Sequence, residues 1–264
     1  SISVSQANEI NALTTGAVTA TISTGDMSTL NGLEGTGNVY AITVSDTSGD
    51  MGELNALNAK TTGTLTVGAV NTLTGTSAEL TAMLKDANGA AVATTNLSTG
   101  LTGLDGTEDI VLSDSITRAT AETAMAATSG GVTATISDTL ANFVLLSETS
   151  GHAFTYQVSE TTVDAANVLL ADARSTVAID LSNVTSVTGD YDEIQDMYQA
   201  GGFASTNHNA ASPVTLTGLG NEAISADDTD ITVAEANILD GFTSGAVTAT
   251  IATGVESVLD GLNG

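Results

Sequence analysis

Apolar and polar residues alternate along three closely similar stretches of the chain. Residues 14–25 read TTGAVTATISTG, residues 243–254 read TSGAVTATIATG, and residues 131–138 read GVTATISD. In each stretch valine, alanine and isoleucine fall on one face and the threonines fall on the other. A period of two residues is typical of a half-buried β-strand, and the glycine before each stretch indicates a turn. The pattern therefore predicts three equivalent strands in distant parts of the chain.

The beginning and the end of the chain repeat each other at an offset of 229 residues. Ile2-Ser3-Val4 aligns with Ile231-Thr232-Val233, and Gly16–Ile22 is identical to Gly245–Ile251. Similar strand-like stretches recur along the chain, which indicates a repeat protein. They are expected near 2–4, 18–24, 39–45, 63–67, 91–95, 109–113, 132–137, 154–159, 177–182, 214–217, 231–233 and 247–252.

Short amphipathic segments between these stretches have a helical rhythm. Ser3-x-x-Gln6 and Thr232-x-x-Glu235 have the spacing of a capping box, in which each side chain accepts a hydrogen bond from the other residue's free backbone N–H. A helix of two or three turns is marginal on its own, so it must pack on its neighbours to persist. The segments therefore predict short stacked helices.

These elements predict a mainly β protein with short helices, in the form of an elongated parallel β-solenoid. About twelve strand–helix coils of roughly 22 residues each are expected. A solenoid of strands and turns alone is the alternative. Solenoid repeats are expected over 1–183 and 214–264 as one continuous elongated domain, with an insertion between coils over 184–213.

The insertion holds several of the few aromatic residues of the chain. Tyr191, Tyr198, Phe203 and His208 all lie in this region, where the spacing of the strands widens. Insertions in repeat arrays often map to loops on the binding face. These four residues are therefore candidates for contact with a partner, and an elongated helix with a surface loop is the alternative.

The composition restricts the possible partners. Four basic residues face 31 acidic ones, so the formal net charge is −27. Such a surface repels the phosphates of nucleic acids and of anionic membranes, and we expect neither as a partner. No apolar run is long enough to span a membrane, so membrane insertion is not expected. The chain has no cysteine, so its redox compartment cannot be inferred from disulfides.

Acidic residues gather in turns, most densely at Asp227, Asp228 and Asp230. Calcium takes several oxygen ligands from carboxylates and backbone carbonyls. Aligned carboxylates on successive turns could share a structural Ca²⁺ ion, which would also offset the negative charge. Solvated turns and helix caps are the alternative, because aspartate favours such positions.

Catalytic motifs are not evident in the sequence. The two histidines have no spaced nucleophile or acid partner, and neither a dinucleotide-binding nor a phosphate-binding glycine loop is present. We therefore do not expect an enzyme. Repeated Thr-x-Thr pairs are compatible with an ice-binding surface, but the β-propensity of threonine and cross-strand ladders explain them more simply.

The segments ITVAEANILDGFTSGAVTATIATG, ISVSQANEINALTTGAVTATISTG and LNGLEGTGNVYAITVSDT resemble repeat units of giant acidic cell-surface proteins of marine cyanobacteria and similar bacteria. The resemblance covers roughly 1–70 and 225–264. It implies an extracellular or cell-surface protein of adhesin-like or filament-forming type.

A stack of coils exposes unpaired strand edges at both ends, and such edges need a cap or another copy. The sequence starts and finishes within the same repeat unit, so it is either part of a longer array or a protomer that stacks end to end. We therefore expect a structural subunit of an extracellular filament or cell-surface coat that self-associates into a homopolymer. The alternative is a stalk segment of a bacterial adhesin or phage fibre that binds a partner through residues 184–213.

Overall fold

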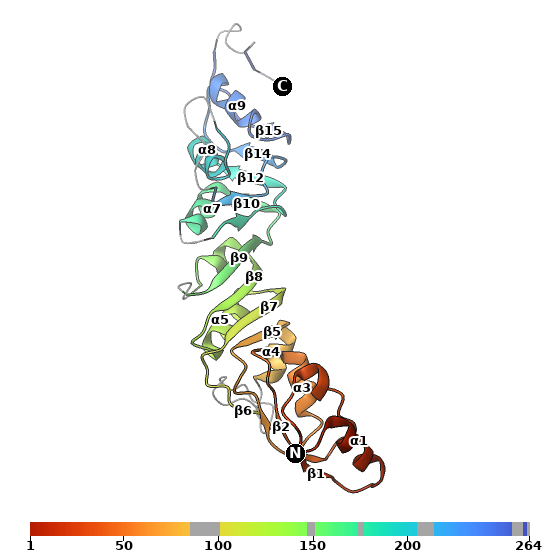
Figure 1. Cartoon of the computed structure of the whole chain (residues 1–264). Helices are drawn as coiled ribbons and strands as arrows, with labels where there is room; N and C mark the ends of the chain where they lie inside the picture. Colours follow the sequence, from red (N-terminus) through yellow and green to blue (C-terminus); the bar gives the residue numbers. More distant parts are fainter. Residues whose placement is uncertain (85–100, 147–150, 174–176, 205–213, 255–260, 263–264) are drawn as a thin grey trace. The chain divides into compact units, whose positions relative to one another are not determined.

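Strands and short helices alternate along the whole described chain. The computed structural model describes residues 1–84, 101–146, 151–173, 177–204, 214–254 and 261–262. Within them the chain forms nine helices and fifteen strands (Figure 1). The helices are α1 (Val4–Ala12), α2 (Met27–Leu30), α3 (Met51–Asn58), α4 (Ser77–Met83), α5 (Arg118–Ala127), α6 (Leu140–Phe143), α7 (Ala165–Asp172), α8 (Tyr191–Ala200) and α9 (Val233–Asp240).

The strands are short. They are β1 (Thr19–Thr21), β2 (Val39–Thr43), β3 (Ser48–Asp50), β4 (Leu65–Thr66), β5 (Thr72–Gly75), β6 (Leu101–Thr102), β7 (Asp109–Ile116), β8 (Val132–Asp138), β9 (Ala153–Val158), β10 (Thr162–Asp164), β11 (Ile179–Asp180), β12 (Ser186–Gly189), β13 (Leu216–Thr217), β14 (Ala223–Ala226) and β15 (Val247–Thr248).

These strands form three sheets in which all pairing is parallel. Two sheets have four strands each, in the orders β1-β2-β4-β6 and β10-β12-β14-β15, and the third has the order β13-β11-β9-β8-β7-β5-β3. Parallel sheets need crossover connections, and helices commonly supply them in α/β proteins. The fold is therefore α/β. The predicted mainly β, elongated parallel β-solenoid of about twelve coils is wrong.

The error has a local cause, because the periodicity indicated one strand before each helix where the structure often has two. The missed strands β3, β5, β10, β12 and β14 are three or four residues long and rich in small residues. Asp50 and Asp164 are the last residues of β3 and β10 and also the N-caps of α3 and α7. Such a segment has too few apolar positions to display a period of two.

Two predicted strands turned out to be single bridges. Ile2 pairs with Ile22 and Ile231 pairs with Ile251, after which helices begin at Val4 and Val233. The two copies of the terminal repeat thus fold in the same way. The predicted strand near 91–95 lies outside the described residues.

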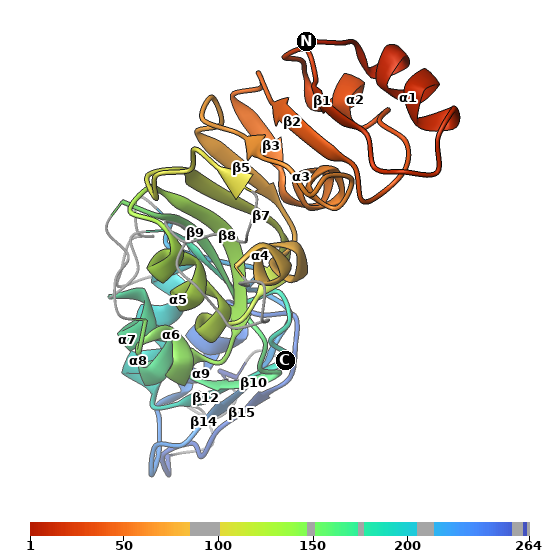
Figure 2. The same ribbon diagram turned by 90° about the horizontal axis from the view of Figure 1, so that it is seen from below.

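Contacts divide the chain into two compact units. The first comprises Ser1–Ala134 and Ser150–Ala153. It contains the sheet β1-β2-β4-β6, and α3 packs on α2 and α4 and contacts β3 and β5 (Figure 2). Its core is narrow and aliphatic, and its fully buried side chains include Leu54, Leu57, Leu65 and Leu73.

The second unit comprises Thr135–Thr149 and Phe154–Gly264. It contains the sheet β10-β12-β14-β15, and α6, α7, α8 and α9 pack successively on one another (Figure 1). Its core includes most of the aromatic rings of the chain. The predicted boundaries at 184 and 213 and the single continuous domain stay predictions.

Each helix begins at a residue that accepts a hydrogen bond from its first turn. The N-caps are Ser3, Asp26, Asp50, Thr76, Thr117, Thr139, Asp164, Asp190 and Thr232. Both predicted capping boxes, at Ser3 with Gln6 and at Thr232 with Glu235, are confirmed. Such caps stabilise short helices by about 1 kcal/mol each. Within the described part of the chain, no helix is long and apolar enough to cross a membrane.

Replacing Leu54 by alanine should destabilise the protein, because this side chain of α3 is fully buried. The loss of buried area and the cavity left behind should cost about 2–5 kcal/mol in the free energy of unfolding. Urea denaturation followed by circular dichroism measures this change. Leu13→Ala is the matched control, since Leu13 is 87% exposed. Equal effects of the two substitutions would contradict the proposed core.

Candidate functional site

A threonine hydroxyl joins successive segments of the chain at three Thr-x-Gly motifs. Thr61, Thr128 and Thr243 each accept a hydrogen bond from the backbone N–H of the glycine two residues later, at 2.9 Å in all three cases. The same hydroxyls donate to the carbonyl oxygens of Tyr40 (2.8 Å), Glu108 (2.6 Å) and Glu222 (2.6 Å), respectively. Each motif thus fixes a turn and attaches it to an earlier strand.

The glycine of each motif lies directly against this earlier strand. A Cβ atom at Gly130 would lie 2.5 Å from the carbonyl oxygen of Glu108, and one at Gly63 or Gly245 would overlap the carbonyl oxygen of Tyr40 or Glu222. Real Cβ atoms do not approach so closely, so only glycine fits. Here the need for glycine comes from the close approach of two main chains.

Buried carboxylates hold the same region of the earlier strand. Glu108 and Glu222 are only 3% and 2% exposed. Glu108 accepts hydrogen bonds from the backbone N–H groups of Asp105 and Gly106, and Glu222 accepts one from that of Gly220. Buried charges are tolerated where such donors surround them. The sequence analysis did not assign this role to either glutamate, and only the recurrence of Thr-x-Gly about 20 residues later could have indicated it.

The Thr-x-Gly motif Thr14-Thr15-Gly16 has the same turn but lacks this earlier strand among the described residues. Gly16 donates to the Thr14 hydroxyl at 3.0 Å, as in the other copies. However, both residues are exposed, and the only atom near a Cβ at Gly16 would be Thr14 Oγ1, at 3.5 Å. Among the described residues the turn therefore forms without a strand against Gly16, whereas further along Ile2 pairs with Ile22 and its N–H donates to the carbonyl oxygen of Thr21.

The same sequence recurs in the strand β15, which has β14 on one side and no described strand on the other. Val18 and Ile22 are 7% and 2% exposed because β2 pairs with β1. Val247 and Ile251 occupy the same positions in the repeat, yet they are partly exposed. A cavity of about 280 Å³ opens beside them. It is also lined by Ala236, Ala249 and Leu262.

The two copies therefore differ in the side on which a strand pairs. Among the described residues, no strand pairs with Thr19 on the side away from β2, and none pairs with Val247 on the side away from β14. The preceding strand of the second copy is β14, where Ile224 pairs with Val247. We take these two edges as the candidate functional site, and we call them the leading edge (Gly16–Ile22) and the trailing edge (Gly245–Ile251).

The acidic cluster predicted to bind calcium has a different local role in the structure. Asp228 accepts a hydrogen bond from the backbone N–H of Tyr191, the first residue of α8, at 2.7 Å. The backbone N–H of Asp227 donates to the carbonyl oxygen of Gly189. Among the described residues no group of three metal-ligating side chains gathers, Asp230 included. Calcium binding by Asp227, Asp228 and Asp230 stays a prediction.

Carboxylates from a later segment cap the first residue of other helices in the same way. Asp46 accepts from Met27 N (2.7 Å), Asp114 from Ser77 N (2.8 Å) and Glu160 from Leu140 N (2.8 Å). Each of these helices thus has its own N-cap and a second acceptor supplied from elsewhere. A negative charge at a helix N-terminus also interacts favourably with the helix dipole. Much of the acidity of the chain therefore serves helix capping.

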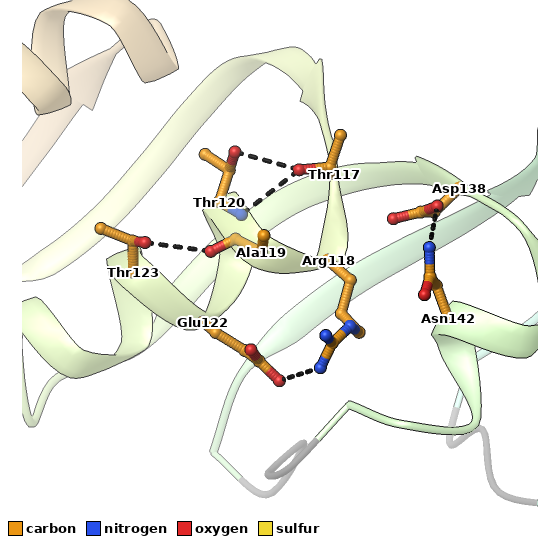
Figure 3. Close-up of polar contacts among 8 residues, drawn as sticks. All are labelled: Thr117, Arg118, Ala119, Thr120, Glu122, Thr123, Asp138 and Asn142. Atoms are coloured by element: carbon orange, nitrogen blue, oxygen red, sulfur yellow. Dashed lines mark hydrogen bonds and ion pairs between the residues drawn. The ribbon is translucent and has the colours of Figure 1, made fainter.

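Polar contacts of this local kind are visible around α5 and α6. Figure 3 shows the Thr117 hydroxyl accepting from Thr120 N at the start of α5, and the Asn142 amide donating to Asp138 at 2.7 Å. Arg118 forms an ion pair with Glu122 one turn later, at 2.6 Å. Such a partly exposed pair contributes less than about 1 kcal/mol.

The predicted partner-binding residues lie mainly in the interior of the second unit. Tyr198 is fully buried, stacks on Phe242 at a ring-centroid distance of 5.1 Å, and meets Phe203 edge to face at 5.4 Å. Its hydroxyl donates to Glu222 at 2.8 Å. Burial, followed by this hydrogen bond to the carboxylate, raises the pKa of Tyr198.

Tyr191 is 8% exposed, and burial raises its pKa as well. The structure thus brings the fully buried Tyr198 and the half-buried Phe203 together. His208 lies outside the described residues. Partner binding through these four residues, and the adhesin or phage-fibre stalk that depends on it, stay predictions without support from the described contacts.

Replacing Gly63 by alanine should destabilise the protein, since the added methyl group would overlap the carbonyl oxygen of Tyr40. Moving the two main chains apart to make room for the methyl group should cost about 1–3 kcal/mol in the free energy of unfolding. The measurement is the urea midpoint of unfolding. Gly68→Ala is the matched control, because its Cβ would have no neighbour closer than 3.8 Å. An unchanged midpoint in Gly63→Ala would show that the two main chains are not in contact.

The cap formed by Asp114 should make stability depend on pH. The hydrogen bond donated by the Ser77 hydroxyl, at 2.6 Å, lowers the pKa of Asp114 below its usual value of 3.8 in the folded protein. A lowered folded-state pKa means that the stabilisation is complete above the unfolded pKa and is lost as the pH falls through the folded one.

We therefore expect the free energy of unfolding to fall below about pH 4, and to fall less in Asp114→Asn. Urea titrations between pH 2 and 6 measure how the free energy of unfolding changes with pH in the wild type and in Asp114→Asn. Ser77→Ala keeps the carboxyl group but removes the main donor, so an NMR titration should show a higher pKa for Asp114 in this variant. An unchanged pKa would contradict the assigned cause.

Comparisons of the chain with protein-family models, with curated proteins and with solved structures found no match.

Proposed function

We propose that the chain is a structural subunit of an extracellular filament or cell-surface coat, and that it self-associates through its uncovered sheet edges. One observation carries this proposal. The leading and trailing edges have the same sequence, and among the described residues Thr19 has no strand partner on the side away from β2 and Val247 has none on the side away from β14, so a second copy can supply both partners. A contact between two different surfaces of the same chain does not close on itself and can therefore generate a polymer.

The distribution of charge supports an interface at these edges. The formal net charge is −27, yet neither residues 14–25 nor residues 243–254 contain a charged side chain. Edge strands are commonly protected from pairing by charged residues. In this chain the acidic residues lie elsewhere, and both edges are left as neutral rows of alanine, valine, isoleucine and threonine.

The use of polar groups in the interior supports a structural role over a catalytic one. Glu108 and Glu222 are buried and accept main-chain hydrogen bonds within their own turns, and the buried Thr128 donates to the main chain of an earlier segment. Groups engaged in this way fix turns and neighbouring segments. The extracellular location is proposed from the resemblance to acidic bacterial surface proteins, which is carried by the same repeat units that form the two edges.

The purified protein should form ordered polymers at micromolar concentration. Because the subunits are strongly acidic, polymerisation should increase when salt is raised from 0.01 to 0.15 M, which shortens the Debye length from about 30 to about 8 Å. Sedimentation velocity measures the size distribution, and negative-stain electron microscopy shows whether the polymers are ordered. A lasting monomer at both salt concentrations would rule out the filament.

A further inference from the structure

We propose that a cavity in the second unit binds a small aliphatic amine, with its ammonium group at Glu160 and Asp164 and its hydrocarbon stem against Leu140, Val163 and Leu170. The cavity has a volume of about 350 Å³ and is lined by residues of α6, α7, β10 and β12. All of these elements belong to the second unit. The inference goes beyond the proposed structural role and does not depend on the two sheet edges.

The cavity opens where two neighbouring helices differ in length. The helices α6 and α7 lie side by side (Figure 2). The helix α6 has only four residues, whereas α7 has eight. Because α6 has no second turn, it does not cover the second turn of α7. Leu170 lies in that second turn, where it lines the cavity and is 48% exposed.

One wall of the cavity is aliphatic. Leu140 and Val163 are 4% and 3% exposed, and they line the same cavity as Leu170. Leu170 is the sixth residue of its helix, a position that is polar in three other helices. These polar residues are Glu9 in α1, Thr123 in α5 and Asp196 in α8. A single exposed leucine is common on protein surfaces, but one that extends a buried apolar wall forms part of a binding surface.

Two carboxylates line the cavity as well. Glu160 accepts a hydrogen bond from the backbone N–H of Leu140 at 2.8 Å, and Asp164 accepts one from that of Asn167 at 3.1 Å. A carboxylate has about four lone-pair positions, so each group keeps most of its accepting capacity. Among the described residues neither carboxylate forms an ion pair. Two negative charges without a cationic partner favour a cation as the ligand.

The aliphatic wall determines which kind of cation fits. A metal ion takes oxygen ligands, and the side chains of Leu140, Val163 and Leu170 supply none. An alkylammonium ion matches both surfaces, because its N–H groups donate to carboxylate oxygens and its methylene groups pack against apolar side chains. The cavity is near the lower end of the roughly 300–1,000 Å³ typical of small-molecule sites. A stem of a few carbon atoms therefore fits it.

Titration of the whole chain with butylamine tests the site. Saturation-transfer NMR observes the ligand, so it measures binding to monomers and to polymers alike. At pH 7 and 0.15 M salt we expect saturable binding of butylamine. Butanol has the same stem without the charge, and methylamine has the charge without the stem, so both should bind at least fivefold more weakly. Equal binding of butanol and butylamine, or no saturable binding of butylamine, would overturn the proposal.

Removal of the two charges tests the ammonium position. Glu160→Gln and Asp164→Asn keep a side-chain oxygen that can accept the capping hydrogen bond, so the double variant should stay folded. It should bind butylamine about fivefold more weakly or less tightly still. Asp50→Asn is the matched control, because Asp50 ends β3 and caps α3 as Asp164 ends β10 and caps α7. An equal loss of affinity in this control would show that the amine responds only to net charge.

Leu170→Ala tests the stem position with a change at a half-exposed site. It should lower the affinity for butylamine several-fold and leave that for methylamine unchanged, because only the longer stem reaches the aliphatic wall. Leu145→Ala is the control, since Leu145 is 61% exposed and is not among the residues that line the cavity. An unchanged affinity for butylamine in Leu170→Ala would overturn the proposed site and leave the filament standing.

Discussion

The contact on which the structure most depends is the close approach of two main chains at the Thr-x-Gly motifs of Thr61, Thr128 and Thr243. The threonine hydroxyl accepts a hydrogen bond from the glycine N–H of its own turn and donates one to a carbonyl oxygen of an earlier segment. One hydroxyl group therefore links two segments of the chain. The glycine admits the carbonyl oxygen of that strand because it has no Cβ. Strands of only two to four residues have few ladder hydrogen bonds, so a side-chain bond at their start contributes much of the register.

Acidic residues fit this architecture because it supplies many free backbone N–H groups. Every short helix leaves four such groups at its start, and few of them lie within the reach of one N-cap. A carboxylate from a later segment accepts a hydrogen bond from another of these N–H groups at four helices. These carboxylates belong to Asp46, Asp114, Glu160 and Asp228. The large negative charge therefore does not by itself indicate a metal-binding or catalytic protein.

Much of the local structure could be predicted from the sequence, whereas the fold class could not. Capping boxes such as Ser3 with Gln6 are coded in four adjacent residues, and the GAVTATI strands show their period directly. The second strand of each pair is too short to show a period. For example, β3 consists only of Ser48, Gly49 and Asp50. Tyr198 was expected at a surface because it is a rare aromatic residue in an insertion. It is buried because Phe242, distant in the sequence, stacks on its ring.

The sequence analysis expected unpaired strand edges at both ends of the repeats, but it could not say which side of each strand is unpaired. The sequences of the leading and trailing edges are identical, so nothing local distinguishes Gly16 from Gly245. Only the structure shows that Gly245 lies against Glu222 while Gly16 lies against nothing described. Exposed edge strands commonly carry charged side chains, because an apolar edge strand can pair with a strand of another chain. A protein with 31 acidic residues has ample means to protect its edges. The absence of charge from both edges therefore argues that pairing there is tolerated or required.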